Sequence, residues 1–189
     1  MASGAQAAET VYAAVAIVLR ERVRRDGGAG VEVLFIERAM RADDPWSGHM
    51  AFPGGRLEGG DSSPRMAACR ETLEEVGLDL SGAEYLGHLG DLSGRSGAPK
   101  PMLVSAHAFH LAEDQPLALD ENEVRSAFWF PLAELRNEAR RTTHRIRELP
   151  EHSFPAIVVG ERESHFVWGL TYRFLEEMFD WMEHPLRLR

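Results

Sequence analysis

The apolar residues of this chain fall into short runs separated by polar segments, which predicts several β-strands. Runs at residues 11–19 and 31–36 flank the glycine-rich segment 27–30 and therefore predict a β-hairpin. Three further apolar runs predict strands: 84–89, 102–111 and 124–130. The polar segment 38–49, which contains proline and glycine, predicts a loop.

Three segments carry helix signals. One helix is expected to begin after Ser63 and another within residues 132–140. In residues 166–182, apolar residues recur at helical spacing and are interrupted by charged residues, which predicts an amphipathic packing helix and not a membrane span. No repeat, low-complexity tract or linker divides the chain, so residues 11–189 are expected to form one domain after a disordered tail, residues 1–10.

The helix after Ser63 has recognisable ends and two distinct faces. Ser63 can cap its start, Pro64 suits its first position, and Gly77 can end it in the left-handed conformation. Its expected core face contains Met66, Cys69, Leu73 and Val76. Its expected opposite face contains Glu71, Glu74 and Glu75.

Three carboxylates on one helical face need a positive partner. At i, i+3 and i+4 spacing they repel one another and weaken an isolated helix. Mg²⁺ or Mn²⁺, which prefer oxygen ligands, would supply the missing charge. The alternative is a solvated acidic face, since glutamate is a common surface residue and a good helix former.

The segment around this helix resembles the signature of the Nudix hydrolase family, G-x5-E-x7-R-E-U-x-E-E-x-G-U, in which U is aliphatic. The resemblance is carried by the glycine-rich approach Phe52-Pro53-Gly54-Gly55 and by the run Arg70-Glu71-Thr72-Leu73-Glu74-Glu75-Val76-Gly77-Leu78. The chain departs from the signature at three points. Asp61 replaces the first Glu, eight residues rather than seven separate Asp61 from Arg70, and Thr72 occupies an aliphatic position.

Resemblance to the Nudix family implies an α/β/α sandwich with a mixed β-sheet, and a metal-dependent hydrolase that cleaves a diphosphate linked to another moiety. It implies that Mg²⁺ or Mn²⁺ is bound by Glu71, Glu74, Glu75 and the backbone carbonyl of Gly54. Arg70 is then expected to orient a catalytic carboxylate, and a simple helix salt bridge is the alternative. In many family members a distant glutamate acts as base or extra ligand. Glu123 is expected to fill this role, although ordinary surface acidity explains it equally well.

Four residues are expected to bind the small-molecule diphosphate substrate: Arg38, His49, Arg56 and Arg95. His49 lies beside the glycine-rich turn, where it would contact a phosphate or make a structural hydrogen bond. Arg95 belongs to segment 90–101, which would hold a phosphate or form a surface hairpin. Trp46 and Phe52 could stack on a base, although packing beneath the loop is the better explanation of Phe52.

Features outside the signature resemble the coenzyme A diphosphatase branch of the family. They are residues 51–53 (Ala-Phe-Pro), the longer spacing after Asp61, and residues 167–171 (Val-Trp-Gly-Leu-Thr). That branch also carries an upstream Arg-x-His-x-Gly pattern, whereas alignment on Gly48 places Asp44 and Trp46 at its Arg and His. Coenzyme A or its thioesters are the leading candidate substrate. ADP-ribose, NADH, nucleotide sugars and dinucleoside polyphosphates are the alternatives.

Composition limits the remaining functions. A chain of 189 residues that is 44% hydrophobic suits one soluble globular domain. Its net charge of −9 argues against a nucleic-acid polymer as partner, because binding to a phosphate backbone normally needs a basic face. Cys69 is the only cysteine, which excludes an internal disulfide, and it is expected to be a buried structural thiol. The chain lacks a basic segment before its first apolar run, so a cytoplasmic protein is expected.

A different class of function is a Nudix-fold nucleotide-binding module without turnover. Such a module would be expected to have lost metal ligands, whereas Arg70 and the three glutamates of the helix are all present. The sequence contains no H-E-x-x-H, G-x-x-x-x-G-K-[ST] or G-x-S-x-G motif, which argues against zinc-peptidase, P-loop and serine-hydrolase chemistry. A homodimer is expected only from the resemblance.

Overall fold

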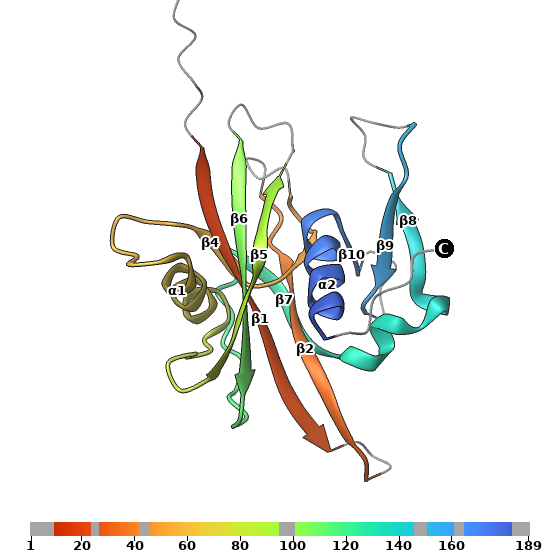
Figure 1. Ribbon diagram of the computed structural model, residues 1–189, viewed down its shortest axis with the longest axis horizontal. Coiled ribbons are helices and arrows are strands. Elements are labelled where there is room, and N and C mark those ends of the chain that lie inside the picture. The colour runs from red at the N-terminus through yellow and green to blue at the C-terminus, as the bar shows by residue number, and fades with distance from the viewer. Residues whose placement is uncertain are drawn as a thin grey trace, which may run out of the picture.

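The structure, a computed structural model, describes residues 10–23, 27–41, 46–94, 101–145, 151–160 and 165–182. These residues form two β-sheets, two α-helices and two short 3₁₀ helices (Figure 1). The predictions for residues 1–9, Asp44 and Arg95 lie outside the described residues.

The main sheet is mixed, as predicted. Its strands are β1 (Val11–Val23), β2 (Ala29–Arg38), β3 (Met50–Ala51), β4 (Gly54–Arg56), β5 (Glu84–Gly94), β6 (Met102–Leu111) and β7 (Val124–Pro131). Five of them lie in the order β3-β2-β1-β6-β5, while β4 pairs with β1 and β7 pairs with β2. Strands β1 and β6 are parallel, and the other pairs of this sheet are antiparallel. The predicted hairpin is the β1–β2 pair, which extends further than the apolar runs.

The helices cover opposite faces of this sheet, so the predicted three-layer α/β/α arrangement is confirmed (Figure 1). Helix α1 (Pro64–Val76) lies on one face, and helix α2 (Gly169–Trp181) lies on the other. Alternation along β1 explains how one strand serves both layers. Ala16 and Val18 pack on the side of α1, whereas Ile17 and Leu19 pack on the side of α2. Each fully buried large side chain, such as Ile17, stabilises the fold by roughly 1.5–3 kcal/mol.

A second, three-stranded sheet lies beside α2 and was not predicted from the sequence. It contains β8 (Arg141–His144), β9 (Phe154–Val158) and β10 (Phe166–Trp168), in the order β10-β9-β8. The single helix expected from residue 166 is therefore wrong over its first three residues, because they pair with β9. The helix expected in residues 132–140 is replaced by two 3₁₀ helices, η1 (Leu132–Arg136) and η2 (Glu138–Arg140), which Asn137 separates in an extended conformation.

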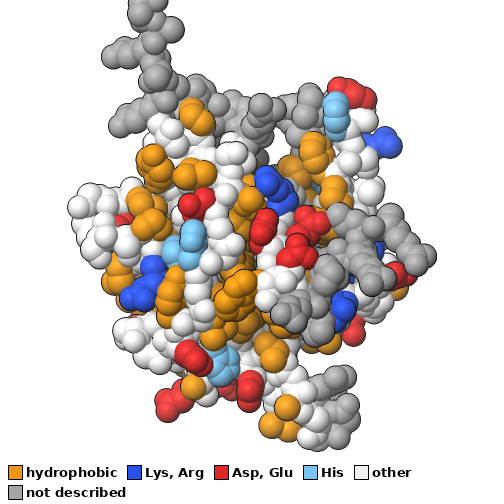
Figure 2. Space-filling model, in the orientation of Figure 1, with side chains coloured by type: hydrophobic (Ala, Val, Ile, Leu, Met, Phe, Trp, Pro, Cys, Tyr) orange, Lys and Arg blue, Asp and Glu red, His pale blue; other side chains and the backbone are white. Residues whose placement is uncertain are grey.

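Helix α2 is amphipathic, as predicted. Tyr172, Phe174, Leu175, Met178 and Phe179 are buried. Acidic side chains gather over the position of α2 on the face shown in Figure 2. None of the helices in the described ranges is long and apolar enough to span a membrane.

Candidate metal and substrate site

Helix α1 begins and ends at the predicted residues. The Ser63 hydroxyl accepts a hydrogen bond from the backbone N–H of Met66 at 3.3 Å, and Pro64 occupies the first turn. Gly77 has φ 72° and donates its N–H to the carbonyl of Leu73 at 3.0 Å. These local signals place the helix that carries the acidic residues.

The expected core face of α1 is confirmed for Val76 and wrong for Met66 and Leu73. The buried residues of the helix are Ala67, Ala68, Thr72, Glu75 and Val76. Met66 is 43% exposed, Leu73 is 51% exposed, and Cys69 is only partly buried, although burial still raises its thiol pKa. The reason is that α1 packs against β1 and β4, where small residues allow a close approach. The carboxylate of Glu75 is therefore directed into the protein.

Two glycines of β4 receive the carboxylates of α1. The backbone N–H of Gly54 donates to Oε2 of Glu75 at 2.8 Å. A Cβ at Gly55 would overlap the carboxylate of Glu71. Gly54 has φ 151°, and a Cβ there would collide with the backbone of Ala14 and Val15 in the adjacent strand. The glycine pair is needed because backbone and carboxylates approach so closely.

The C-terminal end of α1 holds the loop that carries Glu123. Helix termini leave backbone carbonyls without intrahelical partners. Here the N–H of Ala118 donates to the carbonyl of Val76 at 2.9 Å, and the N–H of Asp120 donates to the carbonyl of Glu75 at 3.1 Å. Residues distant in the sequence are thereby brought to the acidic helix.

Three of the predicted acidic residues converge. One carboxylate oxygen from each of Glu71, Glu75 and Glu123 lies within 4.8 Å of the others. Glu75 is buried, Glu71 is partly buried and Glu123 is exposed, so the cluster opens to solvent on one side. Glu74 lies outside this group and instead contacts Arg70 at 2.8 Å.

Arg70 links the helix to the preceding loop. Its Nε and Nη2 donate to the two carboxylate oxygens of Asp61 at 3.1 and 3.0 Å. Its Nη1 contacts Glu71 at 3.0 Å, and its Nη2 also reaches the carbonyl of Arg56 at 3.1 Å. A two-point contact fixes a guanidinium more firmly than a single one. Asp61, whose role was open in the sequence, therefore orients the arginine that contacts Glu71.

The electrostatics of the cluster favour a cation. Burial raises the pKa of Glu75 to about 8, although the hydrogen bond from Gly54 and the charge of Arg38 oppose this shift. Burial also raises the pKa of Glu71, against the effect of Arg70. The neighbouring carboxylates, including Glu123, raise both pKa values further. A bound cation would therefore stabilise the charged forms of both carboxylates, which burial and their mutual repulsion disfavour.

The other predicted substrate-binding residues differ in position. Arg38 is partly buried and close enough to Glu75 to lower its pKa. Arg56 is exposed and contributes its carbonyl to Arg70. The ring of His49 packs edge-on against Trp168 at 5.2 Å between centroids. Of the predicted stacking residues, Phe52 is buried against Phe35, with ring centroids 5.3 Å apart, so packing is its confirmed role.

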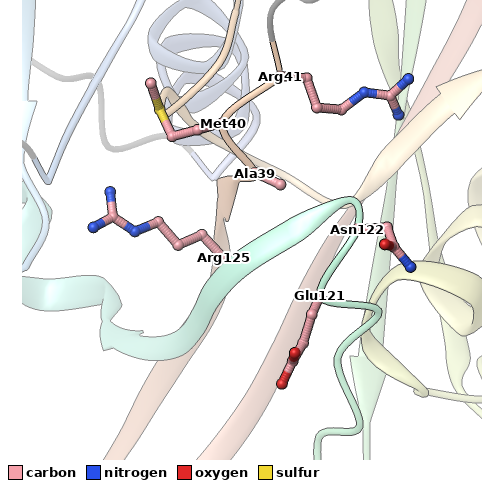
Figure 3. Close-up of a pocket in the computed structure, with 6 residues that line it drawn as sticks. All are labelled: Ala39, Met40, Arg41, Glu121, Asn122 and Arg125. Carbon is pink, nitrogen blue, oxygen red and sulfur yellow. The ribbon is translucent and has the colours of Figure 1, made fainter.

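An open cavity of about 690 Å³ lies beside the loop that carries Glu123. It is lined by Ala39, Met40, Arg41, Glu121, Asn122 and Arg125 (Figure 3). In this view Arg125 and Met40 project to one side of the loop, and Arg41 and Asn122 project to the other. Arg125 and Arg41 were not predicted from the sequence. Arg125 lies two residues after Glu123, and Arg41 lies three residues after Arg38. This closeness to predicted site residues was the signal in the sequence.

Sequence comparison places the chain in a known family. The model of the NUDIX domain matches residues 10–151. The uncharacterized Nudix hydrolase NudL of Escherichia coli strain K12 is 30% identical over 132 residues, which cover 70% of this chain and 66% of NudL. An uncharacterized protein of Schizosaccharomyces pombe is 45% identical over 107 residues, which cover 54% of this chain and 32% of that protein. The chain thus spans less than two thirds of each of these relatives.

Solved structures show the same fold. The C. elegans Ap4A hydrolase binary complex has a TM-score of 0.59 at 17% identity, with 92% of this chain and 98% of that chain covered. A MutT/nudix family protein from Enterococcus faecalis has a TM-score of 0.60 at 18% identity, with 98% and 68% covered. The chain belongs to the Nudix family. Its assignment to the coenzyme A diphosphatase branch remains a prediction.

Proposed function

We propose that this protein is a Mg²⁺- or Mn²⁺-dependent hydrolase that cleaves the diphosphate linkage of a small molecule linked to a nucleoside diphosphate. The observation that carries the proposal is the convergence of Glu71, Glu75 and Glu123 within 4.8 Å. Three carboxylates at this separation match the oxygen ligands that hard divalent cations prefer.

The cluster fits such an ion for a second reason. Glu75 is 2% exposed, and burial raises its pKa to about 8. A buried carboxylate is costly unless a cation or several hydrogen bonds compensate it. Glu71, Glu75 and Glu123 would hold the ion, with Glu74 and the carbonyl of Gly54 as the further ligands that the Nudix signature suggests.

The bound ion and the side chains around it would then have separate roles in hydrolysis. When bound, the ion supplies Lewis acidity and neutralises the charge of the diphosphate. Arg70 holds the side chain of Glu71 in place, and Arg38 adds positive charge beside Glu75. A carboxylate oxygen of the exposed Glu123 can accept the proton of the attacking water if it does not itself bind the ion.

Coenzyme A or one of its thioesters is the leading substrate within this proposal. It is supported by the Ala-Phe-Pro approach to the glycine pair, the spacing after Asp61, and the segment 167–171. The alternatives are ADP-ribose, NADH, nucleotide sugars and dinucleoside polyphosphates. Among proteins of this fold, one structure is of an Ap4A hydrolase, and the NUDIX domain of Shewanella oneidensis NrtR is complexed with ADP ribose, so both compounds belong in the test.

The proposed function is tested by measuring turnover of a panel of candidate substrates. Purified protein is incubated with Mg²⁺ or Mn²⁺ and with coenzyme A, acetyl-CoA, ADP-ribose, NADH, a nucleotide sugar, diadenosine polyphosphates or nucleoside triphosphates, and the products are resolved by chromatography. Release of 3′,5′-ADP and 4′-phosphopantetheine would establish coenzyme A as substrate. Turnover of another member alone would replace coenzyme A while retaining the diphosphatase proposal.

Two variants connect turnover to the site. Glu75→Gln removes one ligand charge at nearly constant volume and is expected to lower kcat at least 100-fold. Glu113→Gln changes an exposed glutamate after β6 and serves as the matched control, with kcat within twofold of the wild type. Absence of metal-dependent turnover on every compound, together with nucleotide binding, would support the non-catalytic binding module instead.

A further inference from the structure

We infer that Arg125 binds a phosphate group that the substrate carries outside the diphosphate that is cleaved. The inference rests on the proposed function and extends it to the class of substrate. It assigns a role to a residue that the Nudix signature does not include.

Arg125 is placed at the edge of the candidate site. It lies two residues after Glu123, at the start of β7, and lines the cavity beside that residue (Figure 3). Its side chain is 52% exposed, so the guanidinium reaches solvent. Two lining residues of the cavity, Glu121 and Asn122, directly precede Glu123 of the acidic cluster, so the cavity and the cluster share one loop.

The buried carboxylate of Glu37 accepts a hydrogen bond from Arg125 and positions it. Glu37 of β2 is 2% exposed, and its Oε1 accepts a hydrogen bond from Nη1 of Arg125 at 3.2 Å. Its Oε2 accepts a hydrogen bond from the hydroxyl of Ser126 at 2.8 Å and lies 3.3 Å from Nε2 of His165. Since Glu37 is fixed by the core of the sheet, it restricts the orientations available to the Arg125 guanidinium.

The geometry distinguishes a binding residue from a simple counter-ion. An arginine that only neutralised Glu37 would be expected to bury its guanidinium against both carboxylate oxygens. Arg125 instead makes one contact, and within the described ranges it has no second carboxylate partner. A guanidinium has five N–H donors, so several remain for a ligand. A planar fork of donors matches the oxygens of a phosphate group.

The charges around the cavity favour an anion. Arg125 and Arg41 are cationic, and Glu121 is the anionic residue of the lining. Figure 3 shows Glu121 directed away from Arg125 and Met40. The side of the cavity that holds Arg125 is therefore the side on which a phosphate meets positive charge without an opposing carboxylate from the lining.

Two kinds of substrate would supply such a phosphate. One carries a phosphomonoester on a ribose, as coenzyme A does, and the other carries additional phosphates in a polyphosphate chain. A direct binding measurement separates the inference from turnover. Calorimetry in Mg²⁺ buffer compares adenosine 3′,5′-bisphosphate with adenosine 5′-monophosphate, neither of which contains a diphosphate linkage.

If the phosphate is on a ribose, wild-type protein is expected to bind the bisphosphate at least tenfold more tightly than the monophosphate. Arg125→Gln is expected to reduce this ratio to within twofold of unity. Because loss of Arg125 leaves Glu37 with one donor fewer, Arg125→Lys is the second variant. It keeps the charge beside Glu37, and we expect it to fold normally by circular dichroism and to lose at least half of the preference. Arg136→Gln, at an exposed arginine of η1, is the matched control and should keep the wild-type ratio.

Turnover distinguishes a phosphate on a ribose from a phosphate in a polyphosphate chain. If the phosphate is on a ribose, Arg125→Gln lowers kcat/KM for coenzyme A relative to dephospho-coenzyme A and for NADPH relative to NADH. If the phosphate belongs to a chain, the variant leaves those ratios and the bisphosphate preference unchanged, and lowers kcat/KM for diadenosine tetraphosphate relative to diadenosine diphosphate. The inference is overturned if none of these ratios depends on Arg125. The proposed function fails separately, if wild-type protein turns over no compound.

Discussion

Gly55 lies directly against the carboxylate of Glu71, so closely that a methyl group at this glycine would overlap Cδ, Oε1 and Oε2 of the glutamate. The contact joins β4 to α1 across the acidic cluster. The second glycine of the Phe-Pro-Gly-Gly approach is therefore part of the candidate metal site, because the absence of a side chain leaves room for the Glu71 carboxylate.

Gly55→Ala should weaken binding of Mn²⁺ at least tenfold. The new Cβ must displace the Glu71 carboxylate, and the oxygens of Glu71, Glu75 and Glu123 will no longer meet within 4.8 Å. Calorimetric titration of the metal-free protein with Mn²⁺ measures the effect. Gly60→Ala, in the loop that follows β4, is the control, since a Cβ there has no neighbour within 4 Å. Equal affinities for the two variants would show that Glu71 is not a ligand.

The sequence predicted the ends of α1 because capping is local. Ser63, Pro64 and Gly77 act within one helical turn, and the structure has all three where they were expected. It could not predict the buried face, because the partner of α1 is a glycine-bearing strand. Against such a strand, Ala67 and a carboxylate pack more closely than a large apolar residue.

The convergence of Glu123 with α1 was anticipated only from the resemblance. It depends on backbone hydrogen bonds from Ala118 and Asp120 to the end of the helix, and such contacts leave no periodic pattern in the sequence. The second sheet was missed for a related reason. Its strands contain only three to five residues, and the pairing of β10 with β9 overrides the helical spacing that begins at residue 166.

Asp61→Asn should loosen Arg70 and lower both stability and turnover. The guanidinium of Arg70 lowers the pKa of Asp61. The pair therefore contributes stability above the unfolded pKa of 3.8, and this contribution is lost as pH falls through the lower folded pKa. We expect a loss of about 1 kcal/mol at pH 7, because Arg70 is partly exposed to solvent.

Urea unfolding of the wild type and Asp61→Asn across pH 2.5 to 7 checks this prediction. The two curves should converge at the acid end, and kcat should fall more than KM rises, since the pair acts through Glu71. Asp180→Asn, at an exposed position of α2, is the control. A constant difference at all pH values would mean that the ion pair is not the cause.

Gly77→Ala should destabilise the fold by roughly 1–2 kcal/mol. The residue has φ 72°, and its Cβ would lie 2.8 Å from the Cβ of Ala118. Because Ala118 belongs to the loop that carries Glu123, the same change should also weaken Mn²⁺ binding. Urea denaturation measures the first effect and calorimetry the second. Gly82→Ala, where a Cβ has no neighbour within 4 Å, should alter neither.

Metal affinity should rise with pH until about pH 8. Burial raises the pKa of Glu75 to about 8, so at neutral pH this carboxylate is largely protonated in the metal-free protein and must lose its proton when a cation binds. One proton should be released per ion, and the Mn²⁺ association constant should increase about tenfold per pH unit below pH 8. Calorimetry in buffers of different ionisation enthalpy measures both quantities.

The same group makes the metal-free protein less stable as pH rises. A folded pKa of about 8, against the usual glutamate pKa of 4.5, means that the folded state binds more protons than the unfolded chain between these values. The stability that Glu75 contributes is then complete below pH 4.5 and is lost progressively up to pH 8, and bound Mn²⁺ should reverse this trend. Glu75→Gln should remove the contribution of this group, because it replaces the titrating carboxyl while keeping the side chain nearly isosteric. The free energy of unfolding of the wild type relative to Glu75→Gln should therefore fall between pH 4.5 and pH 8 in the presence of chelator, and a difference that stays constant or rises would contradict the assignment of Glu75 as the buried carboxylate of the site.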